Sequence, residues 1–436
     1  MDDARIEFLP AHELARRTKS GEISSVELVE AHLSRIAQVN PKLNAVVALD
    51  ADSALAAARD ADSQRDRGAT LGPLHGVPVT IKDWIDVAGL PCTGGDAAFR
   101  NRIPSEDATV VARLRQAGAI VLGKTNVMAD NQVYGPTFNP HDLTRSPGGS
   151  SSGEAAIVAA GGSALGLGSD SGGSLRQPAH LCGVATIKPT TGLVPLTGHF
   201  PVIEPMLDPR TVIGPIARSV EDLALALGVI SGEDGLDPSV APVPLRDWRD
   251  VDLSKLRIAW WIEQVDADPT PETADTVRHA AAALQEAGAL LTEARPKTLD
   301  EAWPLTQTYW SLPESQDLET WRPNAETSLS AGELQEFRFR WGRFRRDMAR
   351  FMADFDLMLL PAAERPAARH GEDVSFAYTL AFSLTGQPAV VVPYGRDPNG
   401  LPIGVQFAAR PWRDHVAIAA AHTLESTGGW RRPGGV

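Results

Sequence analysis

The hydrophobic positions of this chain follow two spacings, one typical of helices and one typical of buried strands. Apolar residues recur at steps of three, four and three at Val26, Val29, Leu33 and Ile36. This is the period of one face of an amphipathic helix. Ser24 and Glu27 fit a capping box, so we expect that helix to begin directly after Ser24.

Helical and strand-like segments then alternate along the chain. Further helices are expected over residues 51–67, 107–117, 154–160, 273–287 and 414–425, with another, capped by Ser219 and Asp222, that runs to about residue 230. Short apolar runs predict strands at residues 77–82, 119–122, 165–168, 256–261, 356–360, 389–392 and 403–408. The alternation predicts an α/β fold with a large parallel or mixed sheet covered by helices on both faces.

Two other segments stand out. Residues 232–244 are rich in Pro, Gly and Asp, which predicts a long surface loop and a candidate boundary between lobes. Over residues 333–355 large apolar side chains recur at steps of three and four, with arginines between them. This favours an amphipathic helix that packs its aromatic face on the body of the protein, with a membrane-surface or partner helix as the alternative.

Charge and composition narrow the function classes. The 436 residues include 43% hydrophobic and 22% charged residues, and the formal net charge is −14. Such a charge does not favour nucleic acid or an anionic membrane as a partner. The uncharged run at residues 155–169 is too short to span a bilayer, the first residues lack a secretory pattern, and only Cys92 and Cys182 could form a disulfide. We therefore expect a soluble, cytoplasmic enzyme.

The segment 146–190 contains the candidate chemistry. Asp170 is followed by Ser-Gly-Gly-Ser, which sets a hydroxyl beside unhindered backbone N–H groups, as acyl transfer to a serine requires. The ten histidines are scattered, so a lysine is considered as the base. Lys82 ends an apolar strand, where poor solvation of its ammonium would lower its pKa.

Six segments of the chain resemble, in order, the signature blocks of the amidase-signature family. They read HGVPVTIKDWIDVAGLPCTGG, PGGSSSGEAAIVAAGG, LGLGSDSGGSLRQPAHLCGVATIKPTTG, GPIARSVEDLALAL, FSLTGQPAVVVP and GLPIGVQFAARPW. The resemblance implies the amidase-signature fold, with a large central mixed twisted sheet sandwiched between helices. It also implies one catalytic domain over residues 1–436, with the signature core at about residues 75–220.

The same resemblance assigns roles to individual residues. It implies that Lys82 is the base, that Ser150 follows a cis peptide bond and bridges base and nucleophile, and that Ser174 is the nucleophile. The backbone N–H groups expected to form the oxyanion hole are those of Ser171, Gly172, Gly173 and Ser174. The residues expected to support the site are Ser151, Asp170 and Arg176.

The implied activity is that of a serine amidohydrolase. Neutral Lys82 would accept a proton from Ser150, which would accept one from Ser174 as it attacks the carbonyl and forms an acyl-enzyme. The expected substrates are small-molecule amides, with esters and carbamates (urethanes) as further substrates. No metal or organic cofactor is implied, and we expect a monomer or a homodimer.

The chain departs from the family pattern in two places. Ser152 stands where the family has a glycine, a change that the start of a helix tolerates. The segment between Asn126 and Pro147 is shorter than in many relatives. Since this segment borders the acyl pocket in the family, we expect Met128 and Tyr134 to line a more open cleft.

Several alternatives remain at this stage. Residues 149–153 also fit G-x-S-x-G, with Ser151 as nucleophile, although the turn before them is not the strand that this motif requires. Cys182 could belong to a Cys–Glu–Lys site, and Arg176 could be only an ion-pair partner of Asp170. The chain could also be a subunit of an amidotransferase that releases ammonia for a partner, or a binding protein on the same fold.

Overall fold

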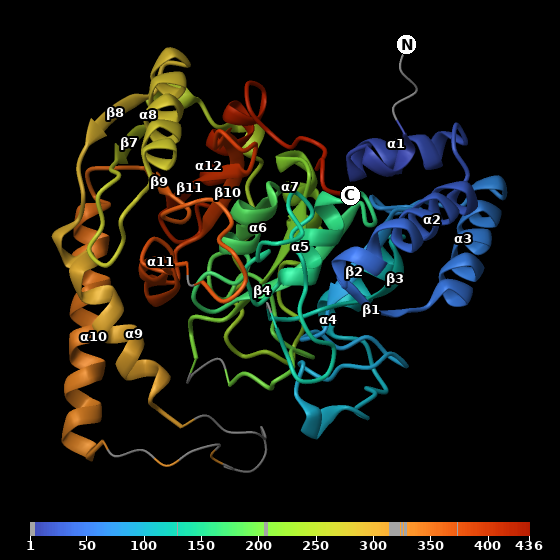
Figure 1. Cartoon of the computed structure of the whole chain (residues 1–436), viewed down its shortest axis with the longest axis horizontal. Coiled ribbons are helices and arrows are strands. Elements are labelled where there is room, and N and C mark those ends of the chain that lie inside the picture. Colours follow the sequence, from blue (N-terminus) through green and yellow to red (C-terminus); the bar gives the residue numbers. More distant parts are fainter. Residues whose placement is uncertain are drawn as a thin grey trace.

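A mixed sheet of eleven strands runs through the middle of the molecule (Figure 1). The computed structural model describes residues 5–128, 130–204, 208–313, 323, 326, 329–372 and 374–436. The strands are β1 (Val46–Leu49), β2 (Pro78–Lys82), β3 (Ile120–Thr125), β4 (Leu165–Asp170), β5 (Ala185–Lys188), β6 (Val212–Ala217), β7 (Arg257–Trp260), β8 (Leu290–Glu293), β9 (Leu357–Pro361), β10 (Ala389–Arg396) and β11 (Pro402–Ala409). Their order is β1-β3-β2-β4-β6-β5-β10-β11-β9-β7-β8.

Helices cover both faces of this sheet. They are α1 (Ala11–Ser20), α2 (Ser25–Leu43), α3 (Ala51–Asp66), α4 (Thr109–Gln116), α5 (Ser152–Ala159), α6 (Arg176–Cys182), α7 (Val220–Ile230), α8 (Pro271–Glu286), α9 (Ala302–Trp310), α10 (Ala331–Phe351), α11 (Leu380–Thr385) and α12 (Asp414–Glu425). Short 3₁₀ helices lie at Ile6–Phe8, Ala97–Phe99, Trp248–Asp250, Leu253–Lys255 and Lys297–Glu301. The predicted α/β architecture with a large mixed sheet between helices is confirmed.

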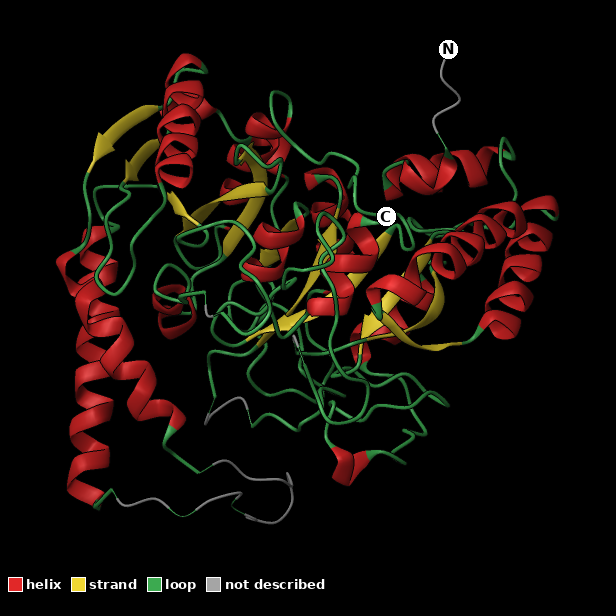
Figure 2. Ribbon diagram, in the orientation of Figure 1, coloured by secondary structure: helices red, strands yellow, loops and turns green. Residues whose placement is uncertain are grey.

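The strand register decides where the candidate chemistry lies. β2 is parallel to both β3 and β4, with Ile81 opposite Lys124 on one side and Leu167 on the other. Because parallel strands end at the same edge of a sheet, Lys82 and Asp170 emerge side by side. Figure 2 shows long loops gathered below the sheet at this edge.

Burial explains why these strands read as continuous apolar runs. Every residue of β2, β3 and β4 is buried. One apolar cluster joins them to α4, α7 and α12, and a second joins the sheet to α2, α3, α5 and α6. Strands covered on both faces lack the polar alternation of a half-exposed sheet.

The predicted N-terminal cap is present at α2 but only in part at α7. At α2 Ser24 and Glu27 form the predicted capping box. At α7 Ser219 accepts a hydrogen bond from the Glu221 N–H, but Asp222 does not cap this helix. Its carboxylate instead accepts the N–H groups of Ala11 and His12, 2.8 Å away, and so caps α1. The prediction for Asp222 was therefore wrong, because the acceptor is used by a helix more than 200 residues earlier.

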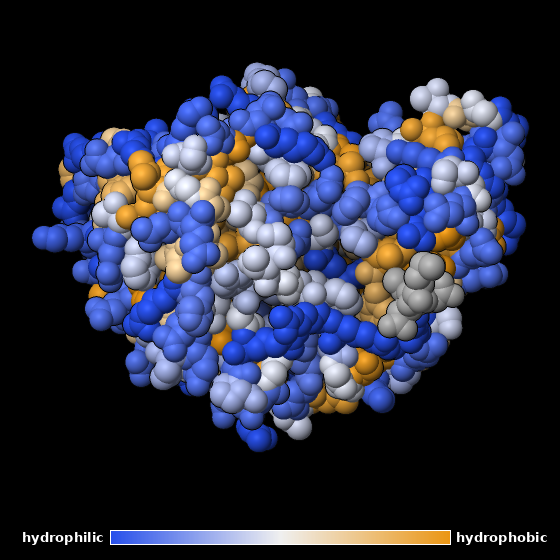
Figure 3. Space-filling model, turned by 90° about the horizontal axis from the view of Figure 1, so that it is seen from above, coloured by the Kyte–Doolittle hydropathy of each residue, from blue (hydrophilic) through white to orange (hydrophobic). Residues whose placement is uncertain are grey.

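The arginine-rich segment forms α10 and packs as predicted on its aromatic face. Phe337, Phe344 and Met348 are buried, and Trp341 donates a hydrogen bond to the Leu384 carbonyl. Within the described residues, none of the helices combines the length and the apolar character needed to cross a membrane. Figure 3 shows one face of the molecule, where hydrophilic residues dominate and apolar residues lie in separate patches.

Candidate active site

Lys82 lies fully buried at the end of β2 and contacts two hydroxyl groups. Its Nζ lies 2.7 Å from Ser150 Oγ, 3.1 Å from Ser169 Oγ and 3.4 Å from the Ser169 carbonyl oxygen. The Trp84 ring covers it, with Nζ 4.1 Å from the ring centroid. We find no carboxylate within ion-pair distance of Nζ among the described residues.

Burial sets the protonation of this amine. It holds the pKa of Lys82 well below 10.5, although the charges of Asp170 and Glu154 oppose the shift. Glu154 is itself buried and accepts hydrogen bonds from Thr80 and Thr125, and burial raises its pKa to about 7. Lys82 therefore has the two properties of a general base, contact with a hydroxyl and a depressed pKa.

The structure brings Ser150 between Lys82 and the Gly-Ser loop. The Gly149–Ser150 peptide bond is cis, and the Ser150 side chain is nearly buried. The next residue joins the two segments, since the Ser151 N–H donates to the Ser174 carbonyl oxygen at 3.2 Å.

Ser174 lies partly exposed directly before α6. We find no hydrogen bond of its hydroxyl within the part of the chain that the structure describes. The Lys82–Ser150 contact is thus formed, while Ser174 Oγ remains free to approach a substrate.

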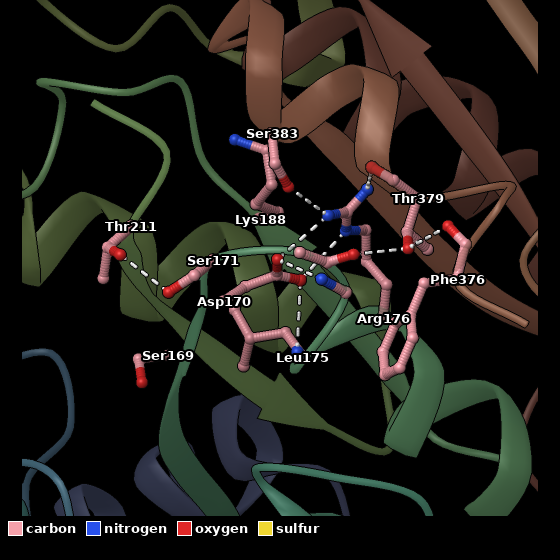
Figure 4. Close-up of polar contacts among 12 residues, drawn as sticks. Ser169, Asp170, Ser171, Leu175, Arg176, Lys188, Thr211, Phe376, Thr379 and Ser383 are labelled. Carbon is pink, nitrogen blue, oxygen red and sulfur yellow. Dashed lines mark hydrogen bonds and ion pairs between the residues drawn. The ribbon is translucent and has the colours of Figure 1, made fainter. Parts of the chain in front are cut away.

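Asp170 and Arg176 hold the loop from its other side through a buried ion pair (Figure 4). Arg176 donates from Nε to Asp170 Oδ2 and from Nη2 to Oδ1, both at 2.9 Å. The remaining Arg176 donors reach Thr379, Ser383 and Gln406. Burial alone would raise the pKa of Asp170, but the guanidinium lowers it below 3.8, so this carboxylate stays charged.

The same carboxylate shapes the loop backbone. Asp170 accepts the N–H of Gly173 at 2.7 Å and that of Leu175 at 3.1 Å. The Gly173 N–H, one of the four expected oxyanion donors, is therefore already engaged. The N–H groups of Ser171, Gly172 and Ser174 have no hydrogen bond within the described residues, so these three are available to an oxyanion.

Met128 and Tyr134, predicted to line the cleft, lie in different surroundings. Met128 is partly exposed, and its N–H donates to the Ser150 carbonyl at 2.9 Å, which sets it beside the Ser150 loop. Tyr134 lies farther along the same segment, and its hydroxyl accepts a hydrogen bond from Thr93. Ser152, which replaces a family glycine, begins α5 as expected and donates to the Met128 carbonyl.

The geometry disfavours the alternative nucleophiles. Ser151 is fully buried and donates its hydroxyl to the Ser169 carbonyl, and no strand precedes it. Cys182 is fully buried and its pKa is raised by burial, which keeps the thiol protonated and unreactive. Cys92 is also a buried free thiol, with a pKa raised to about 12.

Sequence reasoning missed two groups of side chains at the site. Ser169 and His199 contact each other and lie behind Lys82, but His199 is 30 residues from Ser169 and lies in no recognisable motif. Trp310, Phe376 and Leu380 lie over the Gly-Ser loop: a Cβ built on Gly172 would lie 3.4 Å from Leu380 Cδ2 and 3.7 Å from Trp310 Cζ2. Among the described residues we find no group of three or more His, Cys, Asp or Glu that could hold a metal ion.

Sequence comparison gives matches along nearly the whole chain. The sequence model of the family described as Amidase matches residues 27–321 and 315–417. An acylamidase of Rhodococcus erythropolis is 34% identical, with 99% of this chain and 98% of the relative covered. The glutamyl-tRNA(Gln) amidotransferase of Moorella thermoacetica has a subunit that is also 34% identical, with 98% of each chain covered.

Comparison with solved structures also gives matches along nearly the whole chain. A solved structure of 6-aminohexanoate cyclic dimer hydrolase complexed with substrate superposes with a TM-score of 0.86 at 29% identity. The match covers 98% of this chain and 99% of that one. The resemblance inferred from the six sequence blocks is confirmed, and the chain belongs to the amidase family.

Proposed function

We propose that this protein is a serine amidohydrolase in which Lys82, Ser150 and Ser174 act in sequence. The contact between Lys82 Nζ and Ser150 Oγ is 2.7 Å long, and no carboxylate of the described residues lies within ion-pair distance of Nζ; this supports the proposal most directly. A paired lysine would keep its charge, whereas a buried lysine beside hydroxyls can be neutral at working pH. Membership of the amidase family supports the same reaction class.

In the proposed mechanism protons move from Ser174 through Ser150 to Lys82 and later return by the same path. Ser174 Oγ attacks the carbonyl carbon and passes its proton to Ser150, whose own proton goes to Lys82. As the C–N bond breaks, the proton returns through Ser150 to the leaving amine. Water then attacks the acyl-Ser174 ester by the same relay, which releases the acid and restores the free hydroxyl.

Charge on the carbonyl oxygen needs donors that are already in place. We assign this role to the N–H groups of Ser171, Gly172 and Ser174, with Gly173 held by Asp170 to fix the turn. One such donor lowers the activation barrier by about 3 to 4 kcal/mol. Gly173 has φ +145° and a Cβ there would lie 2.5 Å from Thr379 Oγ1, so this turn requires glycine.

The surroundings of the loop favour an uncharged, apolar group on the substrate. The side chains nearest to Gly172 are Leu380 and Trp310, and the indole of Trp310 is 50% exposed. An aryl group could stack on this indole. We propose aryl amides as the preferred substrates, with esters and carbamates cleaved by the same attack.

Mass spectrometry of the trapped enzyme, as intact protein and as peptides, tests the proposal. The protein is incubated with a 4-nitroanilide, a 4-nitrophenyl ester and ethyl N-(4-nitrophenyl)carbamate carrying comparable groups, then quenched and digested. We expect an acyl adduct on Ser174, absent from Ser174→Ala, with release of 4-nitroaniline from the anilide. The adduct mass from the carbamate reports which bond broke. An adduct on Ser150 or Ser151, or turnover by Ser174→Ala, would overturn the assignment.

An amidotransferase subunit is the second candidate, because the Moorella relative is 34% identical over nearly its full length. Such a subunit should release ammonia from glutamine and depend on a partner. We expect the isolated chain to hydrolyse the anilide and to leave glutamine intact. Glutamine-dependent ammonia release with no anilide turnover would favour the subunit. A chain that turns over no substrate by itself would be either a subunit that needs its partner or a binding protein.

A further inference from the structure

Lys82 faces two hydroxyl groups, and only one of them belongs to the proposed relay. A neutral amine has one lone pair, and a base must direct it at the proton it accepts. Ser150 and Ser169 are both close enough to Nζ to donate to that lone pair, at 2.7 and 3.1 Å. The Ser169 carbonyl oxygen and the Trp84 ring can only accept. For Ser150 to be the donor to Lys82, the Ser169 hydroxyl hydrogen must be directed to another acceptor.

The partner of Ser169 is His199, whose ring is nearly buried between two contacts. Its Nδ1 lies 2.8 Å from the Pro201 carbonyl oxygen, and its Nε2 lies 3.1 Å from Ser169 Oγ. A carbonyl oxygen accepts and never donates, so Nδ1 must carry the hydrogen. Burial lowers the pKa of His199 to about 4, so the ring is neutral and Nε2 holds a lone pair.

The neutral state of His199 fixes the donor and the acceptor in each hydrogen bond from His199 through Ser169 to Lys82. Ser169 must donate its hydroxyl hydrogen to His199 Nε2, because that nitrogen can only accept. The Ser169 oxygen in turn accepts an N–H of Lys82. The lone pair of neutral Lys82 is left facing the one remaining donor, the Ser150 hydroxyl.

We propose that His199 is a positioning residue, which acts through Ser169 to direct the Lys82 lone pair at Ser150. This rests on the relay proposed above and adds to it a residue that acts on the base through the Ser169 hydroxyl. Without His199 the Ser169 hydroxyl is free to turn and donate to Lys82, which occupies the lone pair. The base would then be present, buried and neutral, but directed at the wrong hydroxyl.

The variants that test this separate positioning from structure. His199→Asn retains a short amide that can still donate to the Pro201 carbonyl but ends too far from Ser169 to accept its hydrogen. Ser169→Ala removes the competing hydroxyl itself. The set comprises both single variants, the double variant, and Lys82→Met as the reference for loss of the base.

Two readouts follow the base and the nucleophile. One is kcat and KM on the 4-nitroanilide, and the other is the rate of Ser174 labelling by a fluorophosphonate, which needs an activated serine but no particular substrate. We expect His199→Asn to lower both kcat and the labelling rate on the order of 10-fold to 10²-fold, with KM unchanged. Ser169→Ala alone should lose less, since it removes an acceptor but leaves no competing donor.

The double variant gives the decisive result. Because the damage in His199→Asn comes from the freed Ser169 hydroxyl, adding Ser169→Ala should restore activity to the level of Ser169→Ala alone. Losses that multiply in the double variant, or a His199→Asn enzyme with wild-type kcat, would overturn the proposal. If the wild type is not labelled at Ser174, or Lys82→Met labels normally, the relay itself fails instead. Should His199→Asn not fold, His199→Gln, whose longer amide reaches Ser169, replaces it and must then retain activity close to wild type.

Discussion

The loop that carries Ser174 lies between two buried basic side chains, Arg176 and Lys82, whose surroundings are opposite. On one side Arg176 makes a two-pronged ion pair with Asp170, and its other donors all have acceptors. On the other side the described partners of Lys82 are two hydroxyls, one carbonyl oxygen and an aromatic ring. Both side chains are fully buried, so burial alone does not separate their roles.

Arg176 and Lys82 differ in their partners. A guanidinium beside a carboxylate keeps its charge and fixes geometry, and here it holds the turn through Gly173 and Leu175. An amine without a carboxylate partner loses its proton on burial and becomes a base. We propose that the Arg176 side stabilises the loop and that the Lys82 side activates it. Three predictions test this division, and a fourth concerns a side chain outside it.

The largest effect is expected for Lys82→Met, which removes the base and keeps the side-chain volume. Turnover of the 4-nitroanilide should fall about 10⁴-fold, the loss typical of removing one member of a catalytic triad. The free energy of unfolding should stay the same or rise, because a buried amine without an ion-pair partner is removed. Retained turnover with a wild-type melting curve would contradict the role of Lys82.

Arg176→Met should damage stability where Lys82→Met does not. It leaves the Asp170 carboxylate buried with two backbone N–H partners, and breaking such a pair costs about 3 to 5 kcal/mol. Urea unfolding of both variants at the same pH measures the contrast. The double variant Asp170→Asn/Arg176→Met, which removes both charges, should lose less than Arg176→Met. Equal stability of the Arg176 and Lys82 variants would remove the distinction.

The pH dependence of activity should follow the titration of Lys82, which has no carboxylate partner among the described residues, and not that of the Asp170–Arg176 pair. Only neutral Lys82 accepts a proton, so kcat should fall about tenfold per pH unit as the pH drops below its lowered folded-state pKa. The unfolded lysine keeps its proton up to about pH 10.5, so this group also makes stability rise with pH between the two pKa values. Lys82→Met should flatten that rise relative to wild type.

Glu154 provides the control for this profile, because burial raises its pKa to about 7 and it would titrate within the pH range over which kcat is measured. Glu154→Gln can still accept hydrogen bonds from Thr80 or Thr125 but cannot titrate. The acidic fall of kcat should persist in this variant. A kcat that is flat from pH 6 to 10, with the chemical step rate-limiting, would exclude lysine as the base.

The smallest effect is expected outside both networks, at Trp310. Trp310→Ala removes the half-exposed indole over Gly172 and should raise KM for the aryl anilide by about fivefold, in keeping with about 1 kcal/mol for an aromatic contact. The kcat and KM for an acetyl ester should change little. An equal loss on both substrates would indicate a general disturbance of the loop instead.

Most of the scaffold could be predicted from periodicity, because regular burial leaves a regular pattern. Strands β2, β3 and β4 and helices α2, α3 and α10 lie within a few residues of their predicted positions. The strands β1, β5, β6 and β8 were not predicted. β6, for example, contains Gly214 and Pro215, residues that usually mark turns, and it is held by β4 and β5 on its two sides.

The identities of the site residues could also be predicted from the sequence, whereas one of their contacts could not. Lys82, Ser150, Ser174, Asp170 and Arg176 all lie in contiguous blocks whose composition is unusual, and the structure brings them together at one edge of the sheet. The engagement of the Gly173 N–H by Asp170 could not be predicted from residue types, since it depends on where a carboxylate points.

The sequence by itself determined the family, the fold class and the identities of the groups that could do the chemistry, because these follow from local composition and period. Only the tertiary structure decided which buried basic side chain lacks a carboxylate partner, which N–H groups stay free, and which side chains face the Ser169 hydroxyl. The surroundings of Lys82 and Ser169 depend on contacts across 30 to 87 residues of chain. The contacts of Asp170 with Gly173 and Arg176 span only three and six residues, but they depend on where the carboxylate points in the folded protein. Desolvation and hydrogen-bond direction arise in the folded structure, so the sequence pattern does not contain them.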